Sequence, residues 1–147
     1  MSFQIKAFQE LTMQQLYKIL QQRTQVFVVE QNCPYLEVDG KDEKSIHIFQ
    51  EAAGEIIAYC RILPPGVSYE ETSIGRVLVH EAYRGKGIAY EMMQMAITYI
   101  EETLHQSVIK IQAQSYLEKF YSSLGFTTIS EEYLEDNIPH IDMLRQK

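Results

Sequence analysis

The segment from Val77 to Ala89 constrains the fold of this chain more than any other. An apolar, β-branched run ends at Val79, and a polar link then leads through Arg84–Gly87 into a long helical pattern. Glycine allows a backbone to bend closely around a ligand, and the first N–H groups of a helix have no intrahelical partner and can bind an anion. The segment therefore predicts a strand, a phosphate-binding loop with two cationic side chains, and a helix.

Two well-known phosphate loops do not fit this segment. A Walker loop needs Ser or Thr after its lysine, but Lys86 is followed by Gly87. The dinucleotide-binding fingerprint needs a third glycine where this chain has Tyr90. On spacing alone, an ordinary strand-to-helix turn with two solvated cations is an equal alternative.

Residues 84–89, Arg-Gly-Lys-Gly-Ile-Ala, resemble the Arg/Gln-x-x-Gly-x-Gly/Ala motif of the GNAT superfamily of N-acetyltransferases. Residues 77–81 resemble the strand and link that precede this motif. The resemblance implies acetyl-CoA as the acyl donor, with its pyrophosphate in the loop and its pantetheine arm along the preceding strand. It also implies the cofactor-binding residues, which are Val77, Leu78, Val79, Arg84, Gly85, Lys86, Gly87, Ile88, Ala89 and Gln114.

Length, charge and cysteine content limit the class of protein. With 147 residues and 46% apolar content, residues 1–147 are expected to form a single domain. The net charge of −7 disfavours nucleic acid or an anionic membrane as a partner and mildly favours a cationic amine. No apolar run approaches the ~20 residues of a membrane span, residues 1–6 do not resemble a signal peptide, and only two cysteines occur. These features predict a cytoplasmic protein with reduced thiols, as a monomer or a homodimer.

Hydrophobic periodicity and turn signals predict a mixed α/β fold. Strands are expected at residues 3–8, 45–51, 55–63, 72–79, 108–113, 126–130 and 140–144, and helices at 11–29, 87–105 and 115–124. Capping boxes are expected at Thr12/Gln15 and Ser115/Glu118, and residues 131–137 are expected to form a polar link. The order is that of the GNAT or acyl-CoA N-acyltransferase fold. That fold implies a mostly antiparallel central sheet with a splayed parallel pair, 72–79 and 108–113, and helices on both faces.

The segment 30–44 is expected to be an irregular loop, because it contains Pro34 and Gly40. Its aromatic, thiol and carboxylate side chains suggest an acceptor pocket formed by Tyr35, Glu37 and Asp39; a solvated acidic loop is the alternative. The chain here resembles the ElaA group of these acetyltransferases, in Arg23, Val26–Gln31, Cys33–Tyr35, Glu37, Asp39, Gly40, Asp42, His47 and Ile138–Met143. A subset, Arg23, Phe27, Glu37, Asp39 and Asp42, also resembles the acyl-homoserine-lactone synthases, which are longer enzymes with an acyl-chain tunnel.

Acyl transfer from a thioester to an amine requires a polarised carbonyl, a proton acceptor for the amine and a proton donor for the leaving thiolate. Residues 120–126 resemble the family signature Phe-Tyr-x-x-Leu-Gly-Phe, which implies that Tyr121 is the general acid. Without that match, Tyr121 is more simply a core residue on an apolar helix face. The resemblance also implies a backbone N–H near Leu78 as the carbonyl's donor. Candidate bases are His47 and Glu30, with Glu37 and Asp39 as further possibilities, and the histidines show no metal-ligand spacing.

The expected function is an acetyl-CoA-dependent N-acetyltransferase that moves the acetyl group directly to a primary amine of a small molecule or a protein. Two alternatives stay open. One is an acyltransferase like the acyl-homoserine-lactone synthases, and the other is a CoA-binding module without transfer activity.

Overall fold

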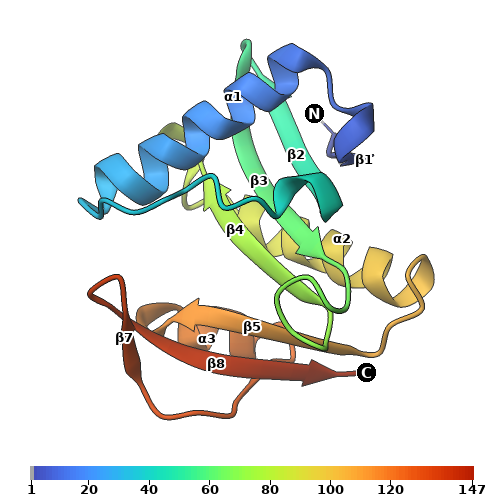
Figure 1. Ribbon diagram of the computed structural model, residues 1–147, viewed down its shortest axis with the longest axis vertical. Helices are drawn as coiled ribbons and strands as arrows, with labels where there is room; N and C mark the ends of the chain where they lie inside the picture. Colours follow the sequence, from blue (N-terminus) through green and yellow to red (C-terminus); the bar gives the residue numbers. More distant parts are fainter. Residues whose placement is uncertain (1) are drawn as a thin grey trace.

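The computed structural model describes residues 2–147, in which two β-sheets meet at a single parallel contact (Figure 1). The first sheet has the order β1-β2-β3-β4; in the second, β8 lies between β5 and β6 and also pairs with β7. The strands are β1 Gln4–Ala7, β2 Ile46–Ala52, β3 Glu55–Leu63, β4 Ser73–Val79, β5 Val108–Gln114, β6 Thr127–Thr128, β7 Tyr133–Glu135 and β8 Ile138–Gln146. Every strand pairing within the sheets is antiparallel.

The parallel contact joins the start of β4 to β5 and confirms the predicted splayed pair. Thr72 is bridged to Ile109, and the Lys110 N–H donates to the Thr72 carbonyl at 2.9 Å. Beyond this point β4 is the edge of the first sheet and β5 the edge of the second, and the two strands diverge (Figure 1). The outer backbone groups of β4 are therefore left to a ligand.

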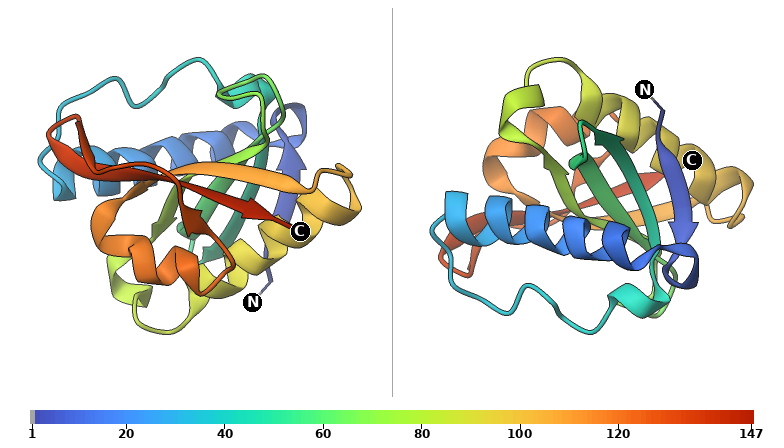
Figure 2. Two further views of the ribbon diagram at one scale, coloured as in Figure 1. Left: turned by 90° about the horizontal axis from the view of Figure 1, so that it is seen from below. Right: turned by 90° about the horizontal axis from the view of Figure 1, so that it is seen from above.

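Helices cover both faces of the sheets, as predicted (Figure 2). The helix α1 spans Met13–Arg23 and continues as a π-helix over Thr24–Glu30, while α2 spans Ile88–Glu102 and α3 spans Glu118–Ser122. Short 3₁₀ turns occupy Phe8–Glu10, Asp42–Lys44, Glu81–Tyr83 and Ser115–Leu117. One apolar cluster lies between the sheets and α2 with α3, and a smaller one lies beneath α1.

The two predicted capping boxes have different outcomes. At Thr12 the box is confirmed, since the Gln15 N–H donates to the Thr12 hydroxyl and the Thr12 N–H donates to the Gln15 amide oxygen, both at 3.0 Å. The box at Ser115 is wrong. The Ser115 hydroxyl is buried without a partner within residues 2–147, and the Glu118 carboxylate accepts from Thr128 instead. A 3₁₀ turn between Ser115 and α3 disrupts the spacing that a capping box requires.

Two further differences from the predicted elements follow from local backbone geometry. Regular alternation along the predicted strand 55–63 would place Ile56 on the face of Ala58, but Ile56 packs beneath α1 with Tyr59, because a bulge in the β2–β3 pairing leaves one residue unpaired. The predicted polar link 131–137 contains β7, which pairs with β8. Asp136 and Asn137 form the hairpin turn with φ of 51° and 63°, the left-handed region that a two-residue hairpin loop favours.

Candidate active site

The gap between β4 and β5 opens into a cleft of about 710 Å³. Its walls include Val77–Val79 from β4, Gln114 from the end of β5, and Tyr121 from α3. The acidic loop adds Tyr35 and Asp39 at another part of the wall. The structure therefore brings most of the predicted site residues to one cavity, although they come from four separate segments of the chain.

The predicted phosphate loop forms an open cradle at the N-terminus of α2. Gly85 and Gly87 have φ of +80° and +78°, which side chains rarely adopt, and a Cβ on either would meet no atom within 4 Å. The first helical hydrogen bond runs from the Glu91 N–H to the Gly87 carbonyl at 3.1 Å, so the N–H groups of residues 88–90 have no intrahelical acceptor. The side chain of Ile88 packs on the core, which leaves its backbone for a ligand. These features fit a pyrophosphate group.

Arg84 connects this cradle to β4 and to the end of α1. Its Nε donates to the Val79 carbonyl at 2.8 Å, and its Nη2 lies 2.8 Å from Glu30 Oε1. The Val79 carbonyl therefore points away from β3, toward the open side of β4. Glu30 lines the cleft, so this candidate base reaches the cavity, where it is ion-paired to a phosphate-loop residue.

Tyr121 lies at the cleft wall with its ring held by other aromatic side chains. The ring makes edge contacts with Phe120 and Phe126, at centroid distances of 5.1 and 6.0 Å. The side chain is 7% exposed, and burial raises the pKa of its hydroxyl well above the usual value. The phenol thus keeps its proton throughout the neutral pH range while it lines the cavity. This placement suits a proton donor, and it also makes Tyr121 part of the core.

Gln114 and Lys86 lie at other points around the site. Gln114 lines the cleft, and its amide nitrogen donates to the Gln31 amide oxygen at 3.2 Å. Lys86 lies over the ring of Tyr83, with Nζ 5.5 Å from the centroid. Among residues 2–147, no three His, Cys, Asp or Glu side chains gather into a group that could hold a metal ion.

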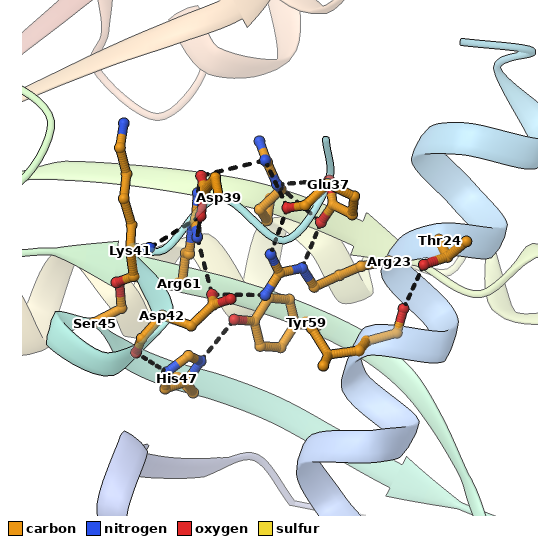
Figure 3. Close-up of polar contacts among 12 residues, drawn as sticks. Arg23, Thr24, Glu37, Asp39, Lys41, Asp42, Ser45, His47, Tyr59 and Arg61 are labelled. Carbon is orange, nitrogen blue, oxygen red and sulfur yellow. Dashed lines mark hydrogen bonds and ion pairs between the residues drawn. The ribbon is translucent and has the colours of Figure 1, made fainter. Parts of the chain in front are cut away.

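The acidic loop is held by a network of three arginines and three carboxylates. Figure 3 shows Arg23 and Arg61 with the carboxylates of Glu37, Asp39 and Asp42. Arg23, fully buried at the end of α1, pairs with Glu37 at 2.5 Å and with Asp42 at 2.7 Å. Arg61 of β3 pairs with Asp42 at 2.9 Å and with Asp39 at 2.5 Å. Burial alone would raise the pKa of the Asp39 and Asp42 carboxyls, but their arginine partners hold both pKa values below the usual range. The loop is therefore an internal ion-pair structure, which differs from the solvated acidic loop considered as an alternative.

This network changes the interpretation of the predicted acceptor residues. Glu37 is 5% exposed, and its carboxylate is occupied by arginines and by the Tyr35 hydroxyl. The third arginine, Arg76 of β4, pairs with Glu37 and Asp39, so the network as a whole carries no net charge. Only Tyr35 and Asp39 of the three predicted residues line the cleft.

His47 is placed as a structural residue. It is fully buried in β2, with Nδ1 2.7 Å from the Tyr59 hydroxyl and Nε2 2.9 Å from the Asp42 carbonyl (Figure 3). Because both ring nitrogens are engaged and the side chain does not line the cleft, its geometry does not support the predicted role as base.

Stability is expected to depend on the protonation of His47. Burial lowers the pKa of this imidazole below 6.5, so the folded state favours the neutral form. The contribution of neutral His47 to the free energy of unfolding is therefore complete above pH 6.5 and is lost as the pH falls. Between pH 7.5 and 5.5, wild type should lose more unfolding free energy than His47→Gln, by up to about 1.4 kcal/mol per pH unit for one proton. Urea titrations measure this difference. His105→Asn, an exchange on the exposed surface, should retain the wild-type slope, and equal slopes for wild type and His47→Gln would contradict the prediction.

Sequence reasoning missed two parts of the site. Arg61 and Arg76 lie in strands and line the cleft, and an arginine within an apolar strand is a signal that a buried carboxylate must pair with it. The β7–β8 hairpin also reaches the cleft, through Glu135, Asp136 and Ile138. The strand predicted at 140–144 is part of β8, and the sequence signal for the hairpin turn before it is the pair Asp136 and Asn137, both of which tolerate positive φ.

Comparison with known proteins agrees with this geometry. The family model described as an acetyltransferase (GNAT) domain matches residues 4–147. Protein ElaA of Escherichia coli is 42% identical over 139 residues, which cover 93% of this chain and 91% of that protein. Its crystal structure superposes with a TM-score of 0.93 at 40% identity, over 99% of this chain and 100% of that one. An acyl-CoA N-acyltransferase from Pseudomonas aeruginosa gives 0.93 at 39% identity, over 99% of both chains.

A more distant structural neighbour is an acyl-homoserine lactone synthase, the class of enzyme that was one of the two alternatives. The CoA-dependent acyl-homoserine lactone synthase BjaI, solved with SAM and isopentyl-CoA, has a TM-score of 0.75 at 15% identity, over 98% of this chain and 82% of that one. A likeness at this identity is a likeness of fold.

No helix in residues 2–147 combines the length and apolar character needed to cross a membrane.

Proposed function

The chain belongs to the GNAT acetyltransferase family, and from this membership we propose that it transfers an acetyl group from acetyl-CoA to a primary amine. The observation that carries the proposal is the cleft between β4 and β5, since its wall includes both Arg84, which leads into the anion-binding end of α2, and the hydroxyl-bearing side chain of Tyr121. The cavity thus has one residue of the phosphate loop and the proposed proton donor on its wall, while Gly85–Ala89 lie outside it.

Three parts of the chain are proposed to bind three parts of acetyl-CoA. The N–H groups of residues 88–90, with Arg84 and Lys86, bind the pyrophosphate. The outer backbone groups of Val77 and Val79 bind the pantetheine arm as a neighbouring strand would. A backbone N–H near Leu78 donates to the thioester carbonyl, where negative charge develops during attack by the amine.

Two proton transfers complete the reaction. The amine loses a proton as its nitrogen forms a bond to the acyl carbon, and the thiolate of CoA gains a proton as it leaves. We assign the donor to Tyr121. Of the four candidate bases, Glu30 and Asp39 line the cleft. Asp39 pairs with both Arg61 and Arg76, whereas Glu30 pairs with Arg84, so we assign the acceptor of the amine proton to Glu30.

The test combines CoA binding by calorimetry with thiol release from acetyl-CoA across a panel of amines. We expect micromolar to millimolar affinity for CoA and thiol release that depends on the amine. CoA binding without thiol release for any amine would favour the non-catalytic module. The panel also includes S-adenosylmethionine, paired with acetyl-CoA and with longer acyl-CoAs. If S-adenosylmethionine with an acyl-CoA reacts faster than the other amines, the result would favour the alternative of an acyltransferase like the acyl-homoserine-lactone synthases.

A further inference from the structure

A bulge in β4 determines which face of the strand each later residue presents. In a regular strand Ile74 and Leu78 would share a face. Ile74 belongs to the cluster beneath α2 and Leu78 to the cluster beneath α1. The change of face occurs where the register with β3 shifts, between Gly75 opposite Arg61 and Leu78 opposite Tyr59. Peptide groups alternate along a strand as side chains do, so the bulge also decides which N–H and C=O groups face the cleft.

Arg76 occupies the bulge with a backbone conformation that arginine disfavours. Its φ is +52°, in the left-handed region that non-glycine residues avoid. A strained residue persists only where its surroundings hold it, so the contacts of the Arg76 side chain identify what holds the bulge.

Those contacts come from the acidic loop and form a clamp. Nε of Arg76 lies 2.9 Å from both carboxylate oxygens of Glu37, and Nη2 lies 3.1 Å from the Glu37 carbonyl and 3.3 Å from Asp39 Oδ2. The guanidinium also lies over the Tyr35 ring, 5.5 Å from its centroid. Three residues of the acidic loop, Tyr35, Glu37 and Asp39, thus contact the guanidinium.

The clamp is anchored to the body of the fold. Glu37 is held at the same time by the fully buried Arg23 of α1, and Asp39 by Arg61 of β3. The loop therefore cannot shift without breaking buried ion pairs, and it holds Arg76 against a rigid support.

We propose that Arg76 is a positioning residue, which holds the β4 bulge so that the backbone of Val77–Val79 presents its donors and acceptors to the acyl donor. This proposal rests on the proposed function. It assigns the charged network a task in acyl transfer, which is to fix the backbone that binds the pantetheine arm and polarises the carbonyl. The competing possibility is that the guanidinium, 20% exposed at the cleft wall, contacts the acceptor directly.

The test compares Arg76→Ala with Arg76→Gly. Both variants lose the same charge and remove the same partner from Glu37 and Asp39, but only glycine accepts positive φ without strain. We expect Arg76→Ala to lower kcat by about 10²-fold, the effect of losing one carbonyl donor, with a smaller change in the Kd for CoA. Arg76→Gly should recover kcat to within roughly 10-fold of wild type, because its backbone can keep the bulge.

The second measurement is the set of amide NMR shifts of Leu78 and Val79, which does not depend on activity. We expect these shifts to move in Arg76→Ala and to stay near wild type in Arg76→Gly. Equally low kcat in both variants with unmoved shifts would show that the guanidinium itself acts on the substrate, and wild-type kcat or unmoved shifts in Arg76→Ala would also overturn the proposal. If the wild-type protein binds CoA but transfers no acetyl group, the proposed function fails, while the shifts still decide whether Arg76 holds the bulge.

Discussion

Replacing Tyr121 with phenylalanine is expected to lower kcat by about 10²–10⁴-fold, the usual contribution of a general acid. The ring of Tyr121 packs edge-on against Phe120 and Phe126, and phenylalanine keeps those contacts. The change therefore removes the hydroxyl alone, and the melting temperature and the Kd for CoA should change little. Steady-state kinetics with whichever amine the panel identifies will measure the effect.

A second phenol at the cleft provides the matched control. Tyr116 lines the same cavity but is 76% exposed, so its hydroxyl is in contact with water. Tyr116→Phe should keep kcat within about 3-fold of wild type if Tyr121 alone donates the proton. Wild-type kcat in Tyr121→Phe would mean that Tyr121 is a packing residue and that water or another group protonates the thiolate.

Replacing Gly87 with asparagine is expected to raise the Kd for CoA by at least about 100-fold, or 2.7 kcal/mol. Asparagine tolerates positive φ better than other side chains, so the backbone at +78° can be kept. Its side chain would extend into the open space of the cradle, where the pyrophosphate is proposed to bind. Calorimetric titration with CoA will measure the loss. Valine is a poorer choice, because a β-branched residue at this φ would rearrange the loop.

The control for this variant is Gly54→Asn in the β2–β3 turn. Gly54 has φ of +79°, and a Cβ there would meet only Lys18 Nζ, at 3.9 Å. The two variants therefore test the same substitution in the same backbone conformation, one in the cradle and one away from it. Gly54→Asn should leave the Kd for CoA within about twofold, a difference below 0.5 kcal/mol. If Gly87→Asn binds CoA as tightly as Gly54→Asn does, the cradle does not hold the pyrophosphate.

Features that depend on neighbouring residues could be predicted from the sequence. The cradle is one of these, because two glycines and a helix N-terminus determine its conformation within a few residues of Gly87. The capping box at Thr12 is another, since both of its hydrogen bonds join residues three positions apart. Most strands and helices were placed correctly for the same reason, and family resemblance then ordered them into the fold.

Features that depend on strand register could not be predicted in this way. Alternation assigns side chains to faces only while a strand stays regular, and the bulges in β3 and β4 each shift the pattern by one residue. This is why Ile56 does not share a face with Ala58, and why the positive φ of Arg76 had no sequence signal. Gly75, directly before Arg76, is the residue at which the sequence would suggest a positive φ.

The sequence by itself determined the conformation of the loop where we propose that a phosphate binds, because that loop is built from adjacent backbone groups. Only the tertiary structure decided the roles of His47, Glu37 and Arg76, because a charged or titratable side chain acts according to the partners that surround it. Arg76 lies 39 positions from Glu37 in the sequence, and Arg23 lies 19 positions from Asp42. Folding brings these charges together in a buried site, where ion pairs and hydrogen bonds occupy groups that the isolated sequence presents as free to react.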